Sequence, residues 1–284
     1  MKLLRYGPKG QEKPGLLDED GRIRDLSDKI NDIDAHILAP ERLSALGSLD
    51  TDSLPPVEGS PRIGPPVGGV GKIVAVGINY AAHGEETKID IPSDPILFSK
   101  AITSLSGPND PVVLPKGSQK ADWEVELAVV IGRRAQYVDE NDALDYVAGY
   151  SIMNDVSERE FQLERDGQWI KGKSFDTFAP FGPWLVTPDE VADPQNLNLW
   201  LDVDGERRQD GNTSTMIFGV RRLISAISGY MTLMPGDVIA TGTPSGVGMG
   251  HKPPIFLKPG DVMRLGVEGL GEQRQEVQAW GGGA

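Results

Sequence analysis

A single stretch of this chain, residues 217–231, shows the apolar periodicity of a convincing amphipathic helix, and the residues MPGD end it. The remaining apolar runs are short, and turn-forming residues separate them, since the 284 residues include 35 Gly and 22 Pro. Short apolar runs between turns are typical of β-strands. The sequence therefore predicts a mainly β fold with some α-helix.

Residues 1–50 form a predicted small α+β unit ahead of the main domain. Two short strands joined by the turn DEDG suggest a hairpin, and a helix is expected at about 36–46. Residues 53–72 are rich in Pro and Gly and are the best linker candidate. We therefore expect a small N-terminal domain with its linker in residues 1–70 and the main domain in residues 71–284.

The charge and composition of the chain exclude several classes of function. A formal net charge of −14 argues against a nucleic-acid partner, because phosphates are neutralised by clustered Lys and Arg. The same charge opposes an acidic small-molecule ligand, unless a bound cation reverses the local field. The absence of cysteine excludes disulfides and thiol chemistry. We find no signal-peptide pattern and no apolar stretch long enough to span a bilayer, so we expect a cytoplasmic protein with no membrane partner.

Two carboxylates share one face of the predicted strand DWEVELAVVIG, residues 122–132. Glu124 and Glu126 are two positions apart, and side chains at that spacing point the same way in a strand. The apolar residues on the opposite face predict a half-buried strand. Asp155 follows another predicted strand, which ends near Met153. Three carboxylates suit Mg²⁺, Mn²⁺ or Ca²⁺, but the spacing alone is equally compatible with a solvated pair of glutamates.

The residues after Asp155 suggest a helix with a polar stripe. Ser157 and Glu160 match a capping box, which predicts that a helix begins there. In such a helix Asp155, Arg159 and Gln162 would lie at i, i+4 and i+7 on one face, where they could flank a metal-bound ligand. An Asp–Arg surface pair is the alternative explanation.

Three further segments contain polar residues of interest. His83 and Glu86 are three positions apart on a predicted helix, the spacing of an imidazole oriented by a carboxylate, although such pairs are also common on surfaces. Lys171 and Lys173 lie in a segment dense with Gly, Pro and aromatic residues, and spacing does not choose between them. The stretch GTPSGVGMG is rich in glycine, but it lacks the G-x-G-x-x-G spacing and the βαβ context of a dinucleotide site.

Taken in order, five blocks of the sequence resemble the signature segments of the fumarylacetoacetate hydrolase family. They are VGINYAAHGEE, DWEVELAVVIG, MNDVSEREFQ, WIKGKSFDTFAPFGPW and IATGTPSGVG, within about residues 70–270. The resemblance implies a mixed β-roll catalytic domain, a homodimer, and a site for Mg²⁺ or Mn²⁺. It also implies a function for residues that spacing alone left ambiguous.

The resemblance assigns a role to each candidate residue. Glu124, Glu126 and Asp155 match the metal ligands, and Lys173 matches a lysine that stabilises developing negative charge. His83 and Glu86 match the pair that activates water, and substrate contacts are implied for Arg159, Gln162 and Thr243. Larger family members carry a further Asp ligand seven residues before the histidine, where this chain has Val76. That departure favours the smaller acylpyruvase-like branch, in which water or substrate completes the coordination.

The implied reaction is metal-dependent hydrolysis of a carbon–carbon bond in a 2,4-diketo acid, which releases pyruvate and a second carboxylate. The segments MKLLRYGPKGQEKPGLLD and IFLKPGD are most similar to bacterial hydrolases of 2,4-diketo-3-deoxy-L-rhamnonate and L-fuconate. Oxaloacetate decarboxylase, fumarylpyruvate hydrolase and ureidoglycolate lyase activities are alternatives within the family. A non-catalytic oligomer that keeps the metal pocket is an alternative from another class.

Overall fold

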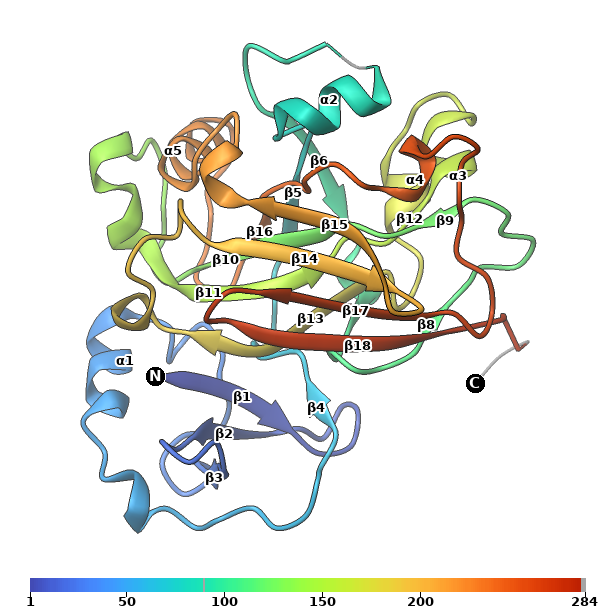
Figure 1. Ribbon diagram of the computed structural model, residues 1–284. Helices are drawn as coiled ribbons and strands as arrows, with labels where there is room; N and C mark the ends of the chain where they lie inside the picture. The colour runs from blue at the N-terminus through green and yellow to red at the C-terminus, as the bar shows by residue number, and fades with distance from the viewer. Residues whose placement is uncertain (89, 282–284) are drawn as a thin grey trace.

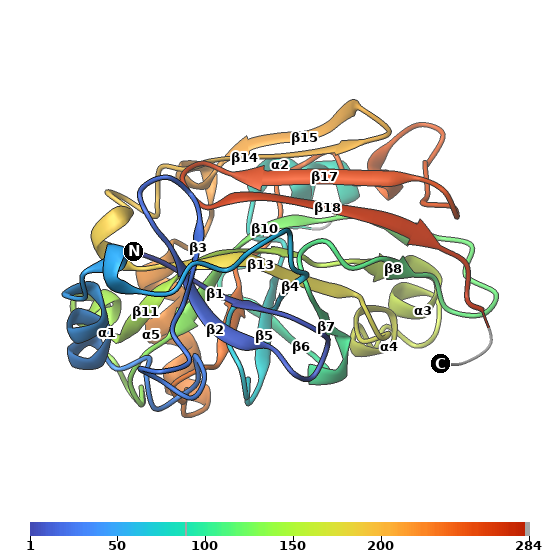
Figure 2. The ribbon, with the colours of Figure 1, turned by 90° about the horizontal axis from the view of Figure 1, so that it is seen from below.

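Short strands separated by turns assemble into two large sheets that pack face to face. The prediction of a mainly β fold is confirmed. The computed structural model describes residues 1–88 and 90–281. An 11-stranded sheet has the order β3-β2-β1-β13-β11-β10-β16-β5-β6, with β4 paired to β1 and β7 paired to β13. A second sheet of order β15-β14-β17-β18-β8 covers one of its faces (Figure 2). Within the described part of the chain, no helix is long and apolar enough to cross a bilayer.

The elements have the following bounds. The strands of the large sheet are β1 (Lys2–Tyr6), β2 (Lys13–Leu17), β3 (Ile23–Asp25), β4 (Ile63–Gly64), β5 (Ile73–Gly77), β6 (Ile96–Lys100), β7 (Leu105–Ser106), β10 (Val125–Ile131), β11 (Val147–Asn154), β13 (Ala179–Val186) and β16 (Val238–Ala240). The second sheet contains β8 (Val112–Val113), β14 (Asn198–Val203), β15 (Glu206–Asn212), β17 (Val262–Val267) and β18 (Gly271–Gln278), and a separate ribbon pairs β9 (Ala121–Asp122) with β12 (Ser157–Glu158).

The helices lie at the edges of the sheets (Figure 1). The α-helices are α1 (Pro40–Gly47), α2 (Ala81–Thr87), α3 (Arg159–Leu163), α4 (Ile170–Lys173) and α5 (Val220–Tyr230). The 3₁₀ segments are η1 (Thr51–Ser53), η2 (Ile102–Ser104), η3 (Glu140–Tyr146), η4 (Pro188–Glu190), η5 (Thr213–Thr215) and η6 (Gly248–Gly250). The predicted long helix is confirmed as α5, and the predicted hairpin at DEDG is confirmed, because β2 and β3 pair antiparallel on either side of that turn.

Both faces of β10 are buried, so the prediction of a half-buried strand is wrong. Leu127 and Val129 pack into a core that the second sheet and α5 complete. Ala128 and Val130, on the other face, pack into a second core that contains Leu3 and Leu16 from the N-terminal strands. The N-terminal segment therefore covers the face that the sequence pattern left open to solvent, and the carboxylate of Glu126 points toward that buried side.

The N-terminal residues continue the large sheet. Strand β1 pairs with β13, with Lys2 opposite Val186, and β4 within the Pro/Gly-rich stretch pairs with β1. The boundary near residue 70 stays a prediction about separate folding units. In the structure the segments on its two sides share one sheet and one core.

Strand directions bring several chain segments to one end of the large sheet. Strand β10 is antiparallel to both β11 and β16, so its beginning meets their ends. Strand β5 is parallel to β16 and ends at the same edge, where α2 follows it. The residues just beyond these strand ends are the ones that the sequence singled out.

Candidate active site

The three predicted metal ligands meet at this edge of the sheet. Glu124 precedes β10, Glu126 lies in it, and Asp155 follows β11, with the Asp155 N–H donating to the Glu124 carbonyl at 2.8 Å. One oxygen from each side chain lies within 4.8 Å of the others, and all three residues are buried. Among residues 1–88 and 90–281, this is the only cluster of its kind.

The three carboxylates do not share the same electrostatic environment. Burial alone would raise the pKa of Glu124, but the Lys173 ammonium and the Arg159 guanidinium outweigh it and hold that pKa at about 2. Burial, together with repulsion from Asp155 and Glu124, raises the pKa of Glu126 well above its ordinary value. Glu126 is therefore the carboxylate that a bound cation would relieve most.

Two buried lysines neutralise Asp155. Lys173 Nζ lies 2.7 Å from Asp155 Oδ2 and 2.7 Å from Glu124 Oε2, while Lys100 Nζ lies 2.5 Å from Asp155 Oδ1. Lys171 is exposed and donates to the Arg165 carbonyl instead. The structure thus chooses Lys173 over Lys171, which the sequence spacing did not do.

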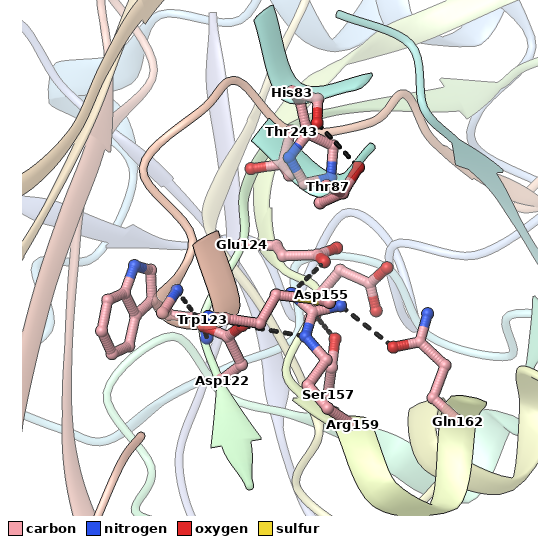
Figure 3. Close-up of polar contacts among 12 residues, drawn as sticks. His83, Thr87, Asp122, Trp123, Glu124, Asp155, Ser157, Arg159, Gln162 and Thr243 are labelled. Atoms are coloured by element: carbon pink, nitrogen blue, oxygen red, sulfur yellow. Dashed lines mark hydrogen bonds and ion pairs between the residues drawn. The ribbon is translucent and has the colours of Figure 1, made fainter. Parts of the chain in front are cut away.

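Arg159 lies at the centre of the polar network, with His83 and Thr243 beyond Glu124 (Figure 3). Its Nε donates to Asp122 Oδ2 at 2.8 Å, its Nη2 forms an ion pair with Glu124 Oε1 at 2.7 Å, and its Nη1 donates to Gln162 Oε1 at 3.0 Å. Residues Arg159 and Gln162 share a face of α3, as predicted. The alternative explanation, an Asp155–Arg159 surface pair, is wrong, because Arg159 is buried and binds two other carboxylates.

The predicted start of this helix at Ser157 is also wrong. Ser157 belongs to β12, and its hydroxyl donates to the Asp155 carbonyl at 3.0 Å. Glu158 is the N-cap of α3, and its side chain accepts the N–H of Glu160. The chain after Asp155 pairs with β9 before it turns into helix, so Asp155 is outside the helical stripe.

His83 and Glu86 lie together on α2, as predicted. His83 Nδ1 is 3.3 Å from Glu86 Oε2, and the His83 side chain is buried in the wall of the pocket. The Gly246 N–H donates to Glu86 Oε1 at 3.0 Å. The glycine-rich stretch that failed as a nucleotide motif therefore holds the carboxylate that orients the imidazole.

The close approach of this loop requires glycine at position 246. Gly246 has a φ of +103°, and a Cβ there would lie 1.9 Å from the Arg208 carbonyl oxygen. We expect Gly246→Ala to destabilise the protein by about 2 kcal/mol or more, because both the backbone conformation and the contact become strained. Thermal unfolding should show a Tm lower by at least about 4 °C.

Gly229→Ala is the matched control for that substitution. Gly229 lies in α5 with no atom near the position of an added Cβ, so alanine should stabilise the helix by about 0.5–1 kcal/mol. A Tm for Gly246→Ala equal to that of the parent protein would contradict the proposed requirement for glycine.

A pocket connects Glu124 and Glu126 with His83. Its wall includes polar groups of the predicted site and a set of apolar side chains, which are Val76, Ile78, Phe98, Leu163, Trp169 and Met249. Thr243 lines the pocket, but its hydroxyl donates to the Val125 carbonyl at 2.9 Å and accepts from Gln209 at 2.7 Å. The side chain of Val76 offers no oxygen to the pocket.

The donor set fits a hard divalent cation. Three buried carboxylates supply oxygen ligands, and the raised pKa of Glu126 reflects burial and repulsion that positive charge would offset. The Gly242 N–H donates to Glu126 Oε2 at 2.9 Å and orients that side chain. The residues present are therefore suited to Mg²⁺ or Mn²⁺.

Sequence reasoning missed two charged residues of this site. Lys100 and Asp122 are fully buried and contact Asp155 and Arg159, respectively. Asp122 adjoins the Glu124 block, which was a usable signal. Lys100 is distant in sequence from its partner, so only the tertiary structure reveals that contact.

The fold and the buried carboxylate site agree with a comparison to known families. Residues 72–278 match the model described as fumarylacetoacetate (FAA) hydrolase, C-terminal. The chain belongs to the fumarylacetoacetate hydrolase family, as the sequence blocks predicted.

Individual relatives resemble the chain along almost its whole length. It is 61% identical over 279 residues to a Burkholderia lata protein named as a hydrolase with no stated substrate, covering 98% of this chain and 99% of that protein. A fumarylacetoacetate hydrolase from Exiguobacterium antarcticum is 36% identical with a TM-score of 0.87, covering 98% and 99% of the two chains. A maleylpyruvate hydrolase from Sphingobium sp. SYK-6, solved with manganese(II) and pyruvate, is 31% identical with a TM-score of 0.82 over the same shares.

Proposed function

We propose that this protein hydrolyses the C3–C4 bond of a 2,4-diketo acid and releases pyruvate and a second carboxylate. The observation that carries the proposal is one pocket lined by Glu124 and Glu126 of the buried triad, by His83 and by Lys173. The maleylpyruvate hydrolase with manganese and pyruvate supports the same class of reaction. We further propose that Mg²⁺ or Mn²⁺ is the cofactor.

The charges of the site explain how an acidic protein could bind an acidic substrate. Four buried carboxylates (Asp122, Glu124, Glu126 and Asp155) lie among three buried cations (Lys100, Arg159 and Lys173), which leaves a formal excess of one negative charge. A divalent ion on Glu124, Glu126 and Asp155 would reverse that sign, and when bound it would supply a Lewis acid for the substrate oxygens. We therefore expect pyruvate to bind the metal-loaded protein more tightly than the metal-free protein.

The protein's own residues would divide the remaining chemistry. His83, oriented by Glu86, would take a proton from the water that attacks the C4 carbonyl. Lys173 donates to the Glu124 and Asp155 carboxylates at 2.7 Å and to the Asp155 carbonyl at 3.5 Å. The oxyanion on C4 would replace the carbonyl as the partner of this third, longest contact. The C3–C4 bond then breaks with its electron pair on C3, and protonation of the resulting enolate gives pyruvate.

Arg159, Gln162 and Thr243 are proposed to hold the substrate. Arg159 and Gln162 are suited to a carboxylate, because the guanidinium and the amide point into the same pocket. The Thr243 hydroxyl donates to the main chain, so this residue would contact substrate through its methyl group or as an acceptor.

Two substrate tails beyond C4 deserve comparison. The resemblance of the N-terminal segment favours a 2,4-diketo-3-deoxy sugar acid, the tail that we propose first. The apolar wall formed by Ile78, Leu163, Trp169 and Met249 favours a shorter tail without hydroxyl groups as the second candidate. The homodimer and the cytoplasmic location stay predictions.

Release of pyruvate from a substrate panel tests the proposal. The panel contains short acylpyruvates, diketo-deoxy sugar acids and oxaloacetate, each with Mg²⁺ and with excess chelator. We expect release from at least one diketo acid, and a loss of about 10²-fold or more in chelator, because a metal ion stabilises developing charge by several kcal/mol. Full activity in chelator would exclude the metal, and release from oxaloacetate alone would favour decarboxylation.

A further inference from the structure

A fourth buried carboxylate, Asp122, lies next to the triad but is not part of it. Asp122 is on β9 and has no exposed surface. Its Oδ1 accepts the N–H groups of Trp123 at 2.8 Å and Gly248 at 2.6 Å. Its Oδ2 accepts the Met249 N–H at 3.0 Å and Arg159 Nε at 2.8 Å. Four donors thus satisfy both oxygens, which offsets the free-energy penalty of burying a charge.

Three of these donors, Arg159, Gly248 and Met249, come from two parts of the proposed active site. Arg159 contacts Glu124 and Gln162, and its hydrogen bonds reach the glycine-rich loop through Asp122. In that loop Gly246 donates to Glu86, and Met249 forms part of the pocket wall. A single carboxylate therefore connects the arginine on α3 with the segment that holds the His–Glu pair.

The loop is built for this close approach. A Cβ on Gly248 would lie 2.1 Å from the Ile255 carbonyl oxygen and 2.8 Å from Asp122 Oδ1. The Trp123 indole N–H, from the residue after Asp122, donates to the Gly246 carbonyl at 3.0 Å. Two consecutive residues, Asp122 and Trp123, thus hydrogen-bond the segment before Glu124 to the loop.

We propose that Asp122 is a positioning residue that fixes Arg159 and the loop 246–249 relative to each other. Its charge orients the guanidinium, and its acceptors hold the loop against Glu86. The separation between the substrate carboxylate and the attacking water is thereby set by one side chain. The part of this inference that concerns substrate rests on the proposed function, whereas the connection between Arg159 and the loop does not.

Asp122→Asn tests the proposal with almost no change in size. The asparagine NH₂ group cannot accept hydrogen bonds, so the two donors that face it lose their acceptor. Hydrogen exchange should become at least about 10-fold faster in the loop 246–249, because Gly248 or Met249 loses the Asp122 oxygen that accepts its N–H and the loop opens more often. Calorimetry with pyruvate and Mn²⁺ should show about 10-fold weaker binding of pyruvate, with the affinity for Mn²⁺ alone changed less than about 3-fold.

Asp237→Asn is the matched control. Asp237 is also buried and accepts the N–H groups of Lys72 and Met234, but it precedes β16 at the opposite end of the strand from Gly242. We expect this variant to lower Tm while exchange in 246–249 and pyruvate binding stay at the parent level. A purely structural role for Asp122 would produce that same pattern in Asp122→Asn and would overturn the proposal.

A second variant keeps the test decisive if Asp122→Asn does not fold. Arg159→Lys keeps the charge but removes the Nε donor, so loop exchange should rise although residue 159 is on another element. Unchanged exchange at 246–249 in Arg159→Lys would refute the connection. If the parent protein releases no pyruvate from any diketo acid, the proposed function fails, and the exchange measurements still decide the role of Asp122.

Discussion

Glu126→Gln is expected to lower kcat by a factor of about 10³ or more and to remove the response of the protein to divalent ions. The substitution takes one of three charges from the triad, and several kcal/mol of charge stabilisation correspond to such a factor. Mn²⁺ at 100 times its Kd should stabilise the folded parent protein by about 2.7 kcal/mol and so raise its Tm. The Tm of the variant should not change on addition of Mn²⁺. Pyruvate release and thermal unfolding, each with and without Mn²⁺, provide the measurement.

The fold should survive this substitution. A glutamine oxygen can accept the Gly242 N–H that Glu126 Oε2 now accepts at 2.9 Å, and loss of charge relieves repulsion from Glu124 and Asp155. The metal-free Tm should therefore be no lower than that of the parent. Glu12→Gln, at an ion-paired glutamate of the N-terminal segment, is the control and should keep the Mn²⁺ response. A Glu126→Gln protein that still gains stability from Mn²⁺ would remove Glu126 from the metal site.

His83→Ala is expected to lower kcat on a diketo acid by about 10² or more and to leave the affinity for pyruvate nearly unchanged. In the proposed reaction the imidazole, oriented by Glu86, takes a proton from the attacking water, so its loss affects the chemical step and not the binding of product. Steady-state kinetics with a diketo acid and calorimetry with pyruvate separate these two effects. His83→Gln, which fills more of the space, should show the same loss and thereby exclude a collapsed pocket as the cause.

The same variant distinguishes hydrolysis from decarboxylation. Loss of CO₂ from oxaloacetate needs no attacking water, so any such activity should fall far less than hydrolysis does. His36→Ala, at an exposed histidine of the N-terminal segment, should leave both activities at the parent level. Near-normal hydrolysis in His83→Ala would instead assign the activation of water to the metal alone.

Much of the site could be predicted because its local patterns survive in the fold. Glu124 and Glu126 are two positions apart, just before and within β10, and His83 and Glu86 are three apart in α2, so both pairings depend only on local backbone geometry. The resemblance of the sequence blocks to the family then implied roles for Asp155 and Lys173, which the residues alone had only marked as candidates. The mainly β fold was predictable for a similar reason, since turn residues divide the chain into short runs.

Predictions failed where a local pattern competed with contacts from distant parts of the chain. The Ser157–Glu160 pattern predicted a helix start, but pairing of β12 with β9 holds Ser157 in a strand. Alternation in β10 predicted one face in solvent, but the N-terminal segment covers that face. Neither competitor can be recognised from the residues of the segment itself.

The sequence by itself determined which of the side chains that we propose for the chemistry lie together along a strand segment or a helix turn, because those relations are set by backbone geometry over a few residues. Only the tertiary structure decided the charge balance of the site. Lys100 reaches Asp155 across 55 positions, and Asp122 joins Arg159 to Gly248, which is 126 positions away from the carboxylate. Contacts between residues so far apart in sequence depend on how the sheets pack against each other, and local residue spacing does not predict them.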